Sequence, residues 1–304
     1  MNVIIAGGSG LIGDALAQKL LEEGSKVWVL SRNPDQSRLA KGVFGVRWDA
    51  RSPEGWVDLV EQADAIVNLA GENLASGRWT NERKRRFLNS RVEAGRAIVA
   101  AVEQAHKRPS VVVQACAVGY YGPSDDRILE EDAPAGSDSM AQICVQWEQS
   151  SQAVRDLGVR HVITRQGIVL ARGGDILNNF ELQFNLFGGG PLGSGRQWIS
   201  WIHIQDMVNV IWFLLHNETT SGVYNALSPE PVTNANFGKT LGKVMRRPYW
   251  FPVPAFALRL VLGEMSSMVL EGQRAMPRRL LDAGFQFEFP GLDAALMDLY
   301  RGQR

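Results

Sequence analysis

A cluster of glycines near the start of the sequence has the spacing of a phosphate-binding loop. Gly7, Gly10 and Gly13 follow the apolar run Val3–Ala6 and precede an amphipathic segment. Glycine is needed where a chain turns with positive φ and where the backbone must approach a pyrophosphate. The free amides and dipole of a following helix attract the anion. The pattern predicts a dinucleotide site, with a purely structural turn as the alternative, and the expected contacts are Gly7, Ser9, Gly10, Leu11, Ile12 and Gly13.

The second apolar run ends in Ser31-Arg32-Asn33, and no acidic residue stands there. An acid at this place bonds the ribose 2′-hydroxyl of NAD, whereas an arginine accommodates the 2′-phosphate of NADP. Arg32, helped by Ser31, therefore predicts NADP(H) as the cofactor. The alternative is that Arg32 only faces solvent in an ordinary loop.

Short β-rich runs alternate with longer helical segments over the first half of the chain. Strands that are continuously apolar are typical of parallel sheets covered on both faces. The alternation predicts an α/β fold, a Rossmann-type doubly wound parallel sheet. The expected strands are Val3–Ala6, Lys26–Leu30, Gly45–Trp48, Ala65–Leu69, Val111–Ala115 and His161–Arg165. The expected helices are Leu11–Glu23, Asn81–Gln104 and Ser139–Asp156.

The later part of the chain is less regular. A helix at Ile204–His216 and a strand at Gly222–Ala226 complete the predicted sheet domain, and prolines punctuate the tail. We expect a Rossmann domain over residues 1–228 and a smaller C-terminal substrate lobe over 229–304. The glycine-rich segment 173–200 should contribute to the cleft between them.

Composition excludes several classes of protein. Basic and acidic residues balance at 32 each, which argues against a nucleic-acid surface. The 2 cysteines and 4 histidines lack ligand spacing, so no metal site is expected. There is no signal-peptide pattern and no apolar run of about 18 residues, which a membrane span requires. These observations predict a cytoplasmic protein that acts on a small molecule, with neither nucleic acid nor membrane as a partner.

Several motifs together resemble the extended short-chain dehydrogenase/reductases, the group that includes nucleotide-sugar epimerases. They are Trp48-Asp49, the segment 68–71, the segment 201–206 and the segment 222–225. The resemblance implies that Asp49 meets the adenine and that Leu69, Ala70 and Gly71 lie beside the cofactor. We place Glu72, Arg91 and Ala115 at the same site. A loop carboxylate is the alternative for Glu72, and a surface salt bridge is the alternative for Arg91.

A narrower resemblance rests on Gly119-Tyr120-Tyr121-Gly122, Trp147-Glu148, the segment 193–197 and the segment 270–274. These motifs are similar to those of an uncharacterised "epimerase family" of atypical reductases. That subfamily carries a C-terminal domain of unknown function, expected here at about 246–293. Its name reports similarity and does not establish an epimerase reaction.

The catalytic residues of the parent group are absent. That group uses a Ser or Thr and a Tyr-x-x-x-Lys pair, in which the lysine helps the tyrosine to shuttle a proton. No Tyr-x-x-x-Lys occurs in this chain. The resemblance places Cys116, Met140 and Cys144 at the Ser, Tyr and Lys positions. Either other groups carry the chemistry, or the protein binds its cofactor without turnover.

Tyr120 and Tyr121 are the candidate replacements, because they follow a strand at the edge of the sheet where ligands bind. Either tyrosine can donate a proton, and packing of the pocket is the alternative role. Cys116 is a candidate nucleophile, or else a small buried residue. The first functional hypothesis is an NADP(H)-binding oxidoreductase or epimerase-like enzyme acting on an unknown small molecule. The second is a non-catalytic NADPH-binding regulator that acts through a protein partner.

Overall fold

A seven-stranded parallel sheet organises the computed structural model, which describes residues 1–34, 39–73 and 79–301. Its order is β11-β7-β5-β4-β1-β2-β3, and the order reverses beside β1. Ligands of such sheets bind at the carboxyl ends of the strands where the order reverses. The predicted Rossmann-type fold is confirmed. The strands are β1 (Asn2–Ala6), β2 (Lys26–Ser31), β3 (Phe44–Arg47), β4 (Ala65–Asn68), β5 (Val111–Ala117), β7 (Arg160–Gln166) and β11 (Gly222–Ala226).

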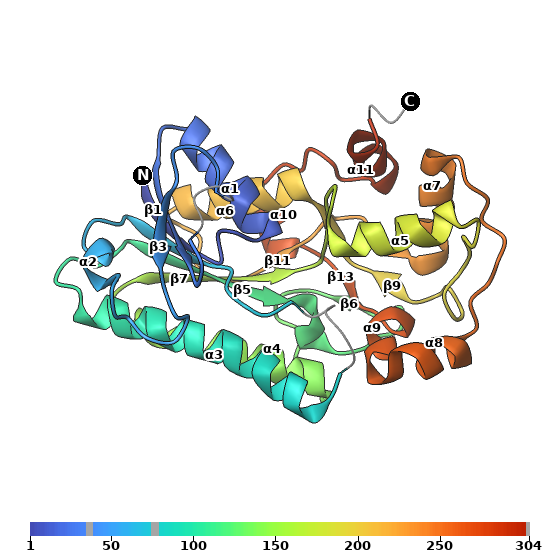
Figure 1. Ribbon diagram of the computed structural model, residues 1–304, viewed down its shortest axis with the longest axis horizontal. Helices are drawn as coiled ribbons and strands as arrows, with labels where there is room; N and C mark the ends of the chain where they lie inside the picture. Colours follow the sequence, from blue (N-terminus) through green and yellow to red (C-terminus); the bar gives the residue numbers. More distant parts are fainter. Residues whose placement is uncertain (35–38, 74–78, 302–304) are drawn as a thin grey trace.

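Helices cover both faces of this sheet (Figure 1). One face carries α1 (Leu11–Glu22), α6 (Ile204–His216) and α10 (Arg278–Asp282), and the other carries α2 (Val57–Val60), α3 (Asn81–Gln104) and α4 (Ser139–Gln149). The strands are mostly buried, except for the edge strand β3, so two apolar layers form the core. Among the described residues, no helix is long and apolar enough to cross a bilayer.

The helix predicted over Ser139–Asp156 is shorter in the structure. α4 ends at Gln149, and a separate 3₁₀ turn, η3 (Gln152–Arg155), follows it. The hydroxyl of Ser150 donates to the Trp147 carbonyl at 2.7 Å, and the Ser151 hydroxyl meets His161 Nε2 at 2.9 Å. Serine side chains that bond in this way compete with the helical backbone, so the two serines end the helix.

A smaller lobe follows, built around its own apolar core of Phe184, Trp201, Phe237 and Leu296. Residues on both sides of position 228 supply this core, and the domain boundary itself stays a prediction. Its helices are α5 (Asp175–Asn185), α7 (Asn234–Met245), α8 (Ala255–Leu262), η4 (Gly263–Ser266), α9 (Ser267–Leu270) and α11 (Leu292–Leu299). The short elements between are η2 (Val118–Tyr121), β6 (Ile128–Leu129), β8 (Ile168–Leu170), β9 (Trp198–Ile199), β10 (Trp201–His203), β12 (Val232–Thr233) and β13 (Arg274–Ala275).

Two buried residues at the start of α6 tie this lobe to the sheet domain. The His203 side chain accepts the Gln205 amide and so caps α6. The Asp206 carboxylate accepts the backbone amides of Glu288 and Phe289 at 2.8 and 2.9 Å. The returning tail is therefore held to α6 by hydrogen bonds from its backbone amides to the Asp206 carboxylate, in addition to apolar contact.

The buried histidines make stability depend on pH. Burial lowers the pKa of His161 and of His203 from 6.5 to about 4 in the folded chain. The unfolded chain therefore binds protons first as the pH falls. We expect the free energy of unfolding to drop between pH 6.5 and 4 by up to about 3 kcal/mol for each histidine.

Chemical denaturation across this range measures the effect. His161→Gln should have a shallower pH dependence than the unaltered chain, because it removes one of the two titrations. The control is His106→Gln, since His106 is exposed. Equal pH slopes for the His161 and His106 variants would contradict the prediction.

Candidate cofactor site

The carboxyl ends of β1 and β4 meet at the glycine loop. The Gly7 amide donates to Leu30 and the Leu69 amide donates to Ala6, so the loop is fixed to both neighbouring strands. Gly7 has φ +77°, and a Cβ there would lie 2.8 Å from the Leu69 carbonyl carbon. A Cβ on Gly13 would lie 2.5 Å from Gly8 Cα. Both positions require glycine for the loop and α1 to pack together.

The start of α1 can hold an anion. Gly10 precedes the helix and has no side chain to cap it. The amides of Leu11, Ile12 and Gly13 belong to the first turn, which has no intrahelical acceptor for them. Ser9 and Gly10 are exposed at the same point. A tight glycine turn followed by an uncapped helix of 12 residues fits the pyrophosphate of a dinucleotide.

The residues at the ends of β2 and β3 lie beside this loop. Ser31 is half-buried and pairs in register with Arg47, and Arg32 is exposed. Asp49 is also exposed, and its Oδ1 accepts the amides of Ser52 and Arg51 at 2.9 and 2.8 Å. These hydrogen bonds, that of Ser52 first, lower the pKa of Asp49. Asp49 thus shapes a turn as an ionised carboxylate, and its contact with adenine stays a prediction.

A buried amide pair shapes the end of β4. Asn68 Nδ2 donates to Gln114 Oε1 at 2.9 Å, and its Oδ1 accepts the Ala70 amide at 3.1 Å. Both side chains are fully buried. The pair fixes the turn through Leu69, Ala70 and Gly71 next to the glycine loop, at the sheet edge that also carries Ala115.

Arg91 reaches this turn from α3. Its guanidinium lies 3.5 Å from the Phe87 ring and 4.6 Å from the Trp147 ring, and it donates to the Glu72 carbonyl at 3.0 Å. A Cβ on Gly71 would lie 2.7 Å from Arg91 Cζ. Burial lowers the pKa of Arg91 to about 10, so the group stays charged at neutral pH. Arg91 is a buried cation behind the β4 turn, and no carboxylate in the described part of the chain forms a surface salt bridge with it.

The Glu72 side chain forms an ion pair with Arg86 at 3.3 Å, and both groups are partly open to solvent. The backbone amide of Glu72 donates to the Ser90 hydroxyl at 3.1 Å. Glu72 therefore lies at the rim of the site as a paired loop carboxylate.

The two candidate tyrosines have different environments. Tyr121 is 3% exposed, donates to Asn225 Oδ1 at 2.7 Å and accepts from Arg165 at 3.0 Å. Burial raises the pKa of Tyr121 to about 12. Its hydroxyl is therefore engaged on both sides and shielded from a substrate. Arg165 is itself held by both Glu148 oxygens, at 2.8 and 3.1 Å.

Tyr120 is half-buried, and its ring meets Tyr121 edge-on with 5.4 Å between the ring centroids. The Arg165 guanidinium lies 3.3 Å from the centre of the Tyr120 ring and holds its orientation. Within the described part of the chain, the Tyr120 hydroxyl makes no hydrogen bond. The geometry favours Tyr120 over Tyr121 as a proton donor.

The positions aligned with the parent group's catalytic residues are apolar. Cys116 and Cys144 are each 1% exposed, and Cys116 Sγ lies 3.7 Å from the Cys144 carbonyl oxygen. Burial raises the pKa of the Cys116 thiol well above its usual value, which disfavours a thiolate nucleophile. Neither thiol is a disulfide partner.

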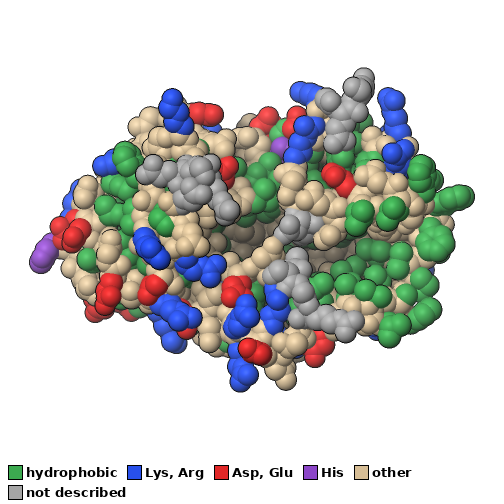
Figure 2. Space-filling model, in the orientation of Figure 1, with side chains coloured by type: hydrophobic (Ala, Val, Ile, Leu, Met, Phe, Trp, Pro, Cys, Tyr) green, Lys and Arg blue, Asp and Glu red, His purple; other side chains and the backbone are tan. Residues whose placement is uncertain are grey.

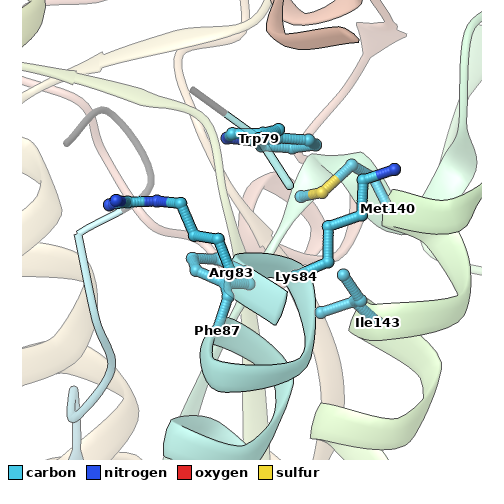
Figure 3. A pocket seen from close by; sticks show the side chains of 6 residues that line it. All are labelled: Trp79, Arg83, Lys84, Phe87, Met140 and Ile143. Carbon is cyan, nitrogen blue, oxygen red and sulfur yellow. The ribbon is translucent and has the colours of Figure 1, made fainter. Parts of the chain in front are cut away.

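The face between the sheet domain and the lobe is hollowed at its centre (Figure 2). A small cavity of about 10 Å³, room for about one water molecule, lies where α3 and α4 begin (Figure 3). Lys84 in its wall forms an ion pair with Glu264 of η4 and so connects α3 to the lobe. The lining residues are Trp79, Arg83, Lys84, Phe87, Met140 and Ile143.

The fold and the loop define a nucleotide-binding protein of the extended short-chain dehydrogenase/reductase type. Residues 3–226 match the model of the NAD dependent epimerase/dehydratase family, and the chain belongs to that family. Residues 253–299 match a domain of unknown function, DUF1731. Both matches agree with the resemblance seen in the sequence motifs.

The similarity to known relatives and solved structures extends over nearly the whole chain. Epimerase family protein YfhF of Bacillus subtilis is 36% identical over 302 residues, which cover 98% of each chain. The chloroplastic SDR39U1 homolog of Arabidopsis thaliana is 38% identical, covering 97% of this chain and 86% of its own. The crystal structure of human SDR39U1 (isoform 2) with NADPH superposes with a TM-score of 0.88 at 34% identity, covering 99% of this chain and all of that one. A Thermus thermophilus UDP-glucose 4-epimerase structure with NAD shares the fold at 19% identity, with full coverage of both chains and a TM-score of 0.79.

The sequence motifs do not reveal the buried group around Arg165. Glu148 stands in one of the family-like motifs, and Arg165 ends an expected strand. The one available signal was the position of Arg165 itself. An arginine that continues an apolar strand, His161–Arg165, is buried only if a carboxylate pairs with it.

Replacing Gly13 by alanine should damage nucleotide binding. The added Cβ would overlap Gly8 Cα and the Gly7 carbonyl oxygen, which are backbone atoms and cannot rotate away. We expect the dissociation constant for NADPH to rise by about tenfold or more. Gly291→Ala is the matched control, because a Cβ there meets only Glu230, at 3.5 Å. Calorimetric titration with unchanged affinity in Gly13→Ala would refute this function of the loop.

Proposed function

We propose that the chain is an NADP(H)-dependent oxidoreductase or epimerase-like enzyme that acts on a small molecule. The choice of NADP(H) rests on Arg32, which is exposed directly after β2. No acidic residue stands there to bond the ribose 2′-hydroxyl of NAD. The NADPH in the human SDR39U1 structure supports the same choice. The relatives solved with NAD share only the fold with this chain.

In this proposal, different residues bind the cofactor and transfer the proton. When bound, the cofactor supplies hydride transfer. The first turn of α1 binds the pyrophosphate, and Arg32 with Ser31 binds the 2′-phosphate. Tyr120 donates or accepts the proton at its hydroxyl, while Arg165 and Tyr121 hold its ring in place. Arg165 and Tyr121 are thus positioning residues.

A second candidate function is a cofactor-binding regulator that acts through a protein partner. It is favoured by the residues at the aligned catalytic positions, because Cys116 and Cys144 are buried thiols and Met140 carries no proton. A protein with these side chains would still bind its cofactor but would lack the proton-transfer groups of the parent group. We place the protein in the cytoplasm under either function.

Arg32→Ala should weaken NADPH binding and leave NADH binding unchanged, because only NADPH carries the 2′-phosphate. A lost charge-assisted contact of about 1.5–3 kcal/mol corresponds to a rise in the dissociation constant of roughly tenfold to a hundredfold. Calorimetry with both cofactors measures this. Arg96→Ala is the control, since Arg96 is exposed on α3. An equal effect on NADH and NADPH, or tighter binding of NADH by the unaltered chain, would overturn the assignment of NADP(H).

Tyr120→Phe should abolish oxidation of bound NADPH without changing its dissociation constant, because only the hydroxyl is removed. Single-turnover absorbance across a panel of carbonyl compounds and nucleotide sugars measures the reaction. Tyr121→Phe should instead lower the free energy of unfolding by about 1–3 kcal/mol, since it leaves the buried Asn225 Oδ1 without its donor and removes one of the acceptors of Arg165. Tight NADPH binding with no turnover on any panel member would favour the regulator.

A further inference from the structure

The C-terminal lobe carries an apolar surface that is exposed among the residues that the structure describes. α8 is apolar except for Arg259 and has no buried residue. The Trp250 indole donates to the Phe187 carbonyl, and the amides of Trp250 and Phe251 donate to Gly189, so this segment joins the end of α5. Figure 2 shows hydrophobic side chains gathered over α5 and α8. We name this surface the α8 face: Leu182, Leu186, Phe187, Trp250, Phe251, Phe256, Leu260, Val261 and Met268, each at least 45% exposed.

Its size is unusual for the surface of a monomer. Trp250, Phe251 and Phe256 are 71%, 62% and 73% exposed. Aromatic side chains bury roughly 150–250 Å² each, so these three alone expose about 300–500 Å². That equals the largest apolar patch of a typical monomer, about 300–600 Å², before the aliphatic side chains are added. An apolar surface of this extent indicates a binding partner.

The charge around the α8 face identifies the partner's chemistry. Residues 231–263 contain no aspartate or glutamate, and their basic residues are Lys239, Lys243, Arg246, Arg247 and Arg259. Arg247 lies 5.0 Å from the Phe187 ring, and Arg259 is exposed on α8 between Phe256 and Leu260. Among the described residues, no carboxylate pairs with Arg246, Arg247 or Arg259.

Some acids also lie on the elements around the α8 face: Asp293 is 3.8 Å from Lys243, and Glu271 is exposed at the end of α9. Glu181 accepts the Tyr300 hydroxyl at 2.6 Å, and Glu264 pairs with Lys84. A two-fold contact between copies of the chain would bring identical cationic patches together, which like charges oppose. An apolar helix face with exposed aromatic and arginine side chains is instead typical of a segment that lies in a membrane interface.

We propose that the α8 face docks on an anionic lipid bilayer, with Phe256 and Leu260 entering the interface and Arg246 and Arg259 meeting lipid phosphates. The sequence patterns alone do not predict a bilayer as a partner. The cytoplasmic leaflet carries the required negative charge. Docking is independent of the proposed enzymatic function, because no residue of the α8 face belongs to the cofactor site.

Flotation of the full chain with lipid vesicles tests the proposal. We expect binding to vesicles of phosphatidylglycerol and phosphatidylcholine, and about tenfold weaker binding to pure phosphatidylcholine. Phe256→Ser with Leu260→Ser should lower the partition coefficient by about tenfold or more, as should Arg246→Gln with Arg259→Gln. Met297→Ser is the matched control, because Met297 is 54% exposed on α11 and lies outside the α8 face.

NADPH affinity and the midpoint of thermal unfolding, measured on the same samples, show that each variant is folded. These readouts also separate a failure of docking from a failure of the proposed function. Absent flotation, or flotation that neither double variant reduces, overturns the proposal. Sedimentation velocity tests whether a second copy of the chain binds the α8 face instead. If the chain forms a stable dimer and Phe256→Ser with Leu260→Ser dissociates it, the α8 face is a dimer interface and the proposal is overturned.

Discussion

Arg165 carries a full positive charge at a position where 3% of its surface meets water. Transfer of such an ion from water costs several kcal/mol even after the protein relaxes. Burial alone would lower the pKa of Arg165, but the hydrogen bonds and charge of Glu148 raise it above its usual value. Removing either partner would leave a buried charge uncompensated, at a cost of about 3–5 kcal/mol. α4, β7 and η2 therefore keep one relative arrangement.

The same group of buried residues extends into the C-terminal lobe. Tyr121 connects Arg165 to Asn225, whose amide Nδ2 donates to the Met276 carbonyl at 2.9 Å. The Glu131 carboxylate accepts the backbone amides of Asn225 and Arg279. Its pKa is raised by burial, although these hydrogen bonds oppose the shift. These directional hydrogen bonds therefore fix the lobe against the sheet beside the cleft. An apolar contact at the same place would let the two parts slide past each other.

Sequence patterns predicted the parts of the fold that local rules determine. α3 has the predicted bounds, Asn81–Gln104, because its apolar spacing and the Thr80 cap are local features. The glycine loop was predictable for the same reason, since its turn and helix start are adjacent in the chain. The end of α4 was not, because Ser151 acts there through His161, which lies on another element. The pairing of Arg165 with Glu148 depends on how β7 and α4 meet in space, and no spacing in the sequence encodes it.

The polar group around Arg165 also determines where chemistry can occur. Tyr120 and Tyr121 are neighbours in the short turn η2, yet Tyr121 is directed into the buried network and Tyr120 offers Arg165 only the face of its ring. Cys116 lies opposite Arg165 in the register of β5 and β7, and it is sealed from solvent with Cys144. Of the three candidates Cys116, Tyr120 and Tyr121, one retains a proton-bearing group that is not already engaged. If this sheet edge transfers a proton, the Tyr120 hydroxyl is the group among them that can do so. Its ring lies against Arg165, whose buried ion pair with Glu148 joins β7 to α4.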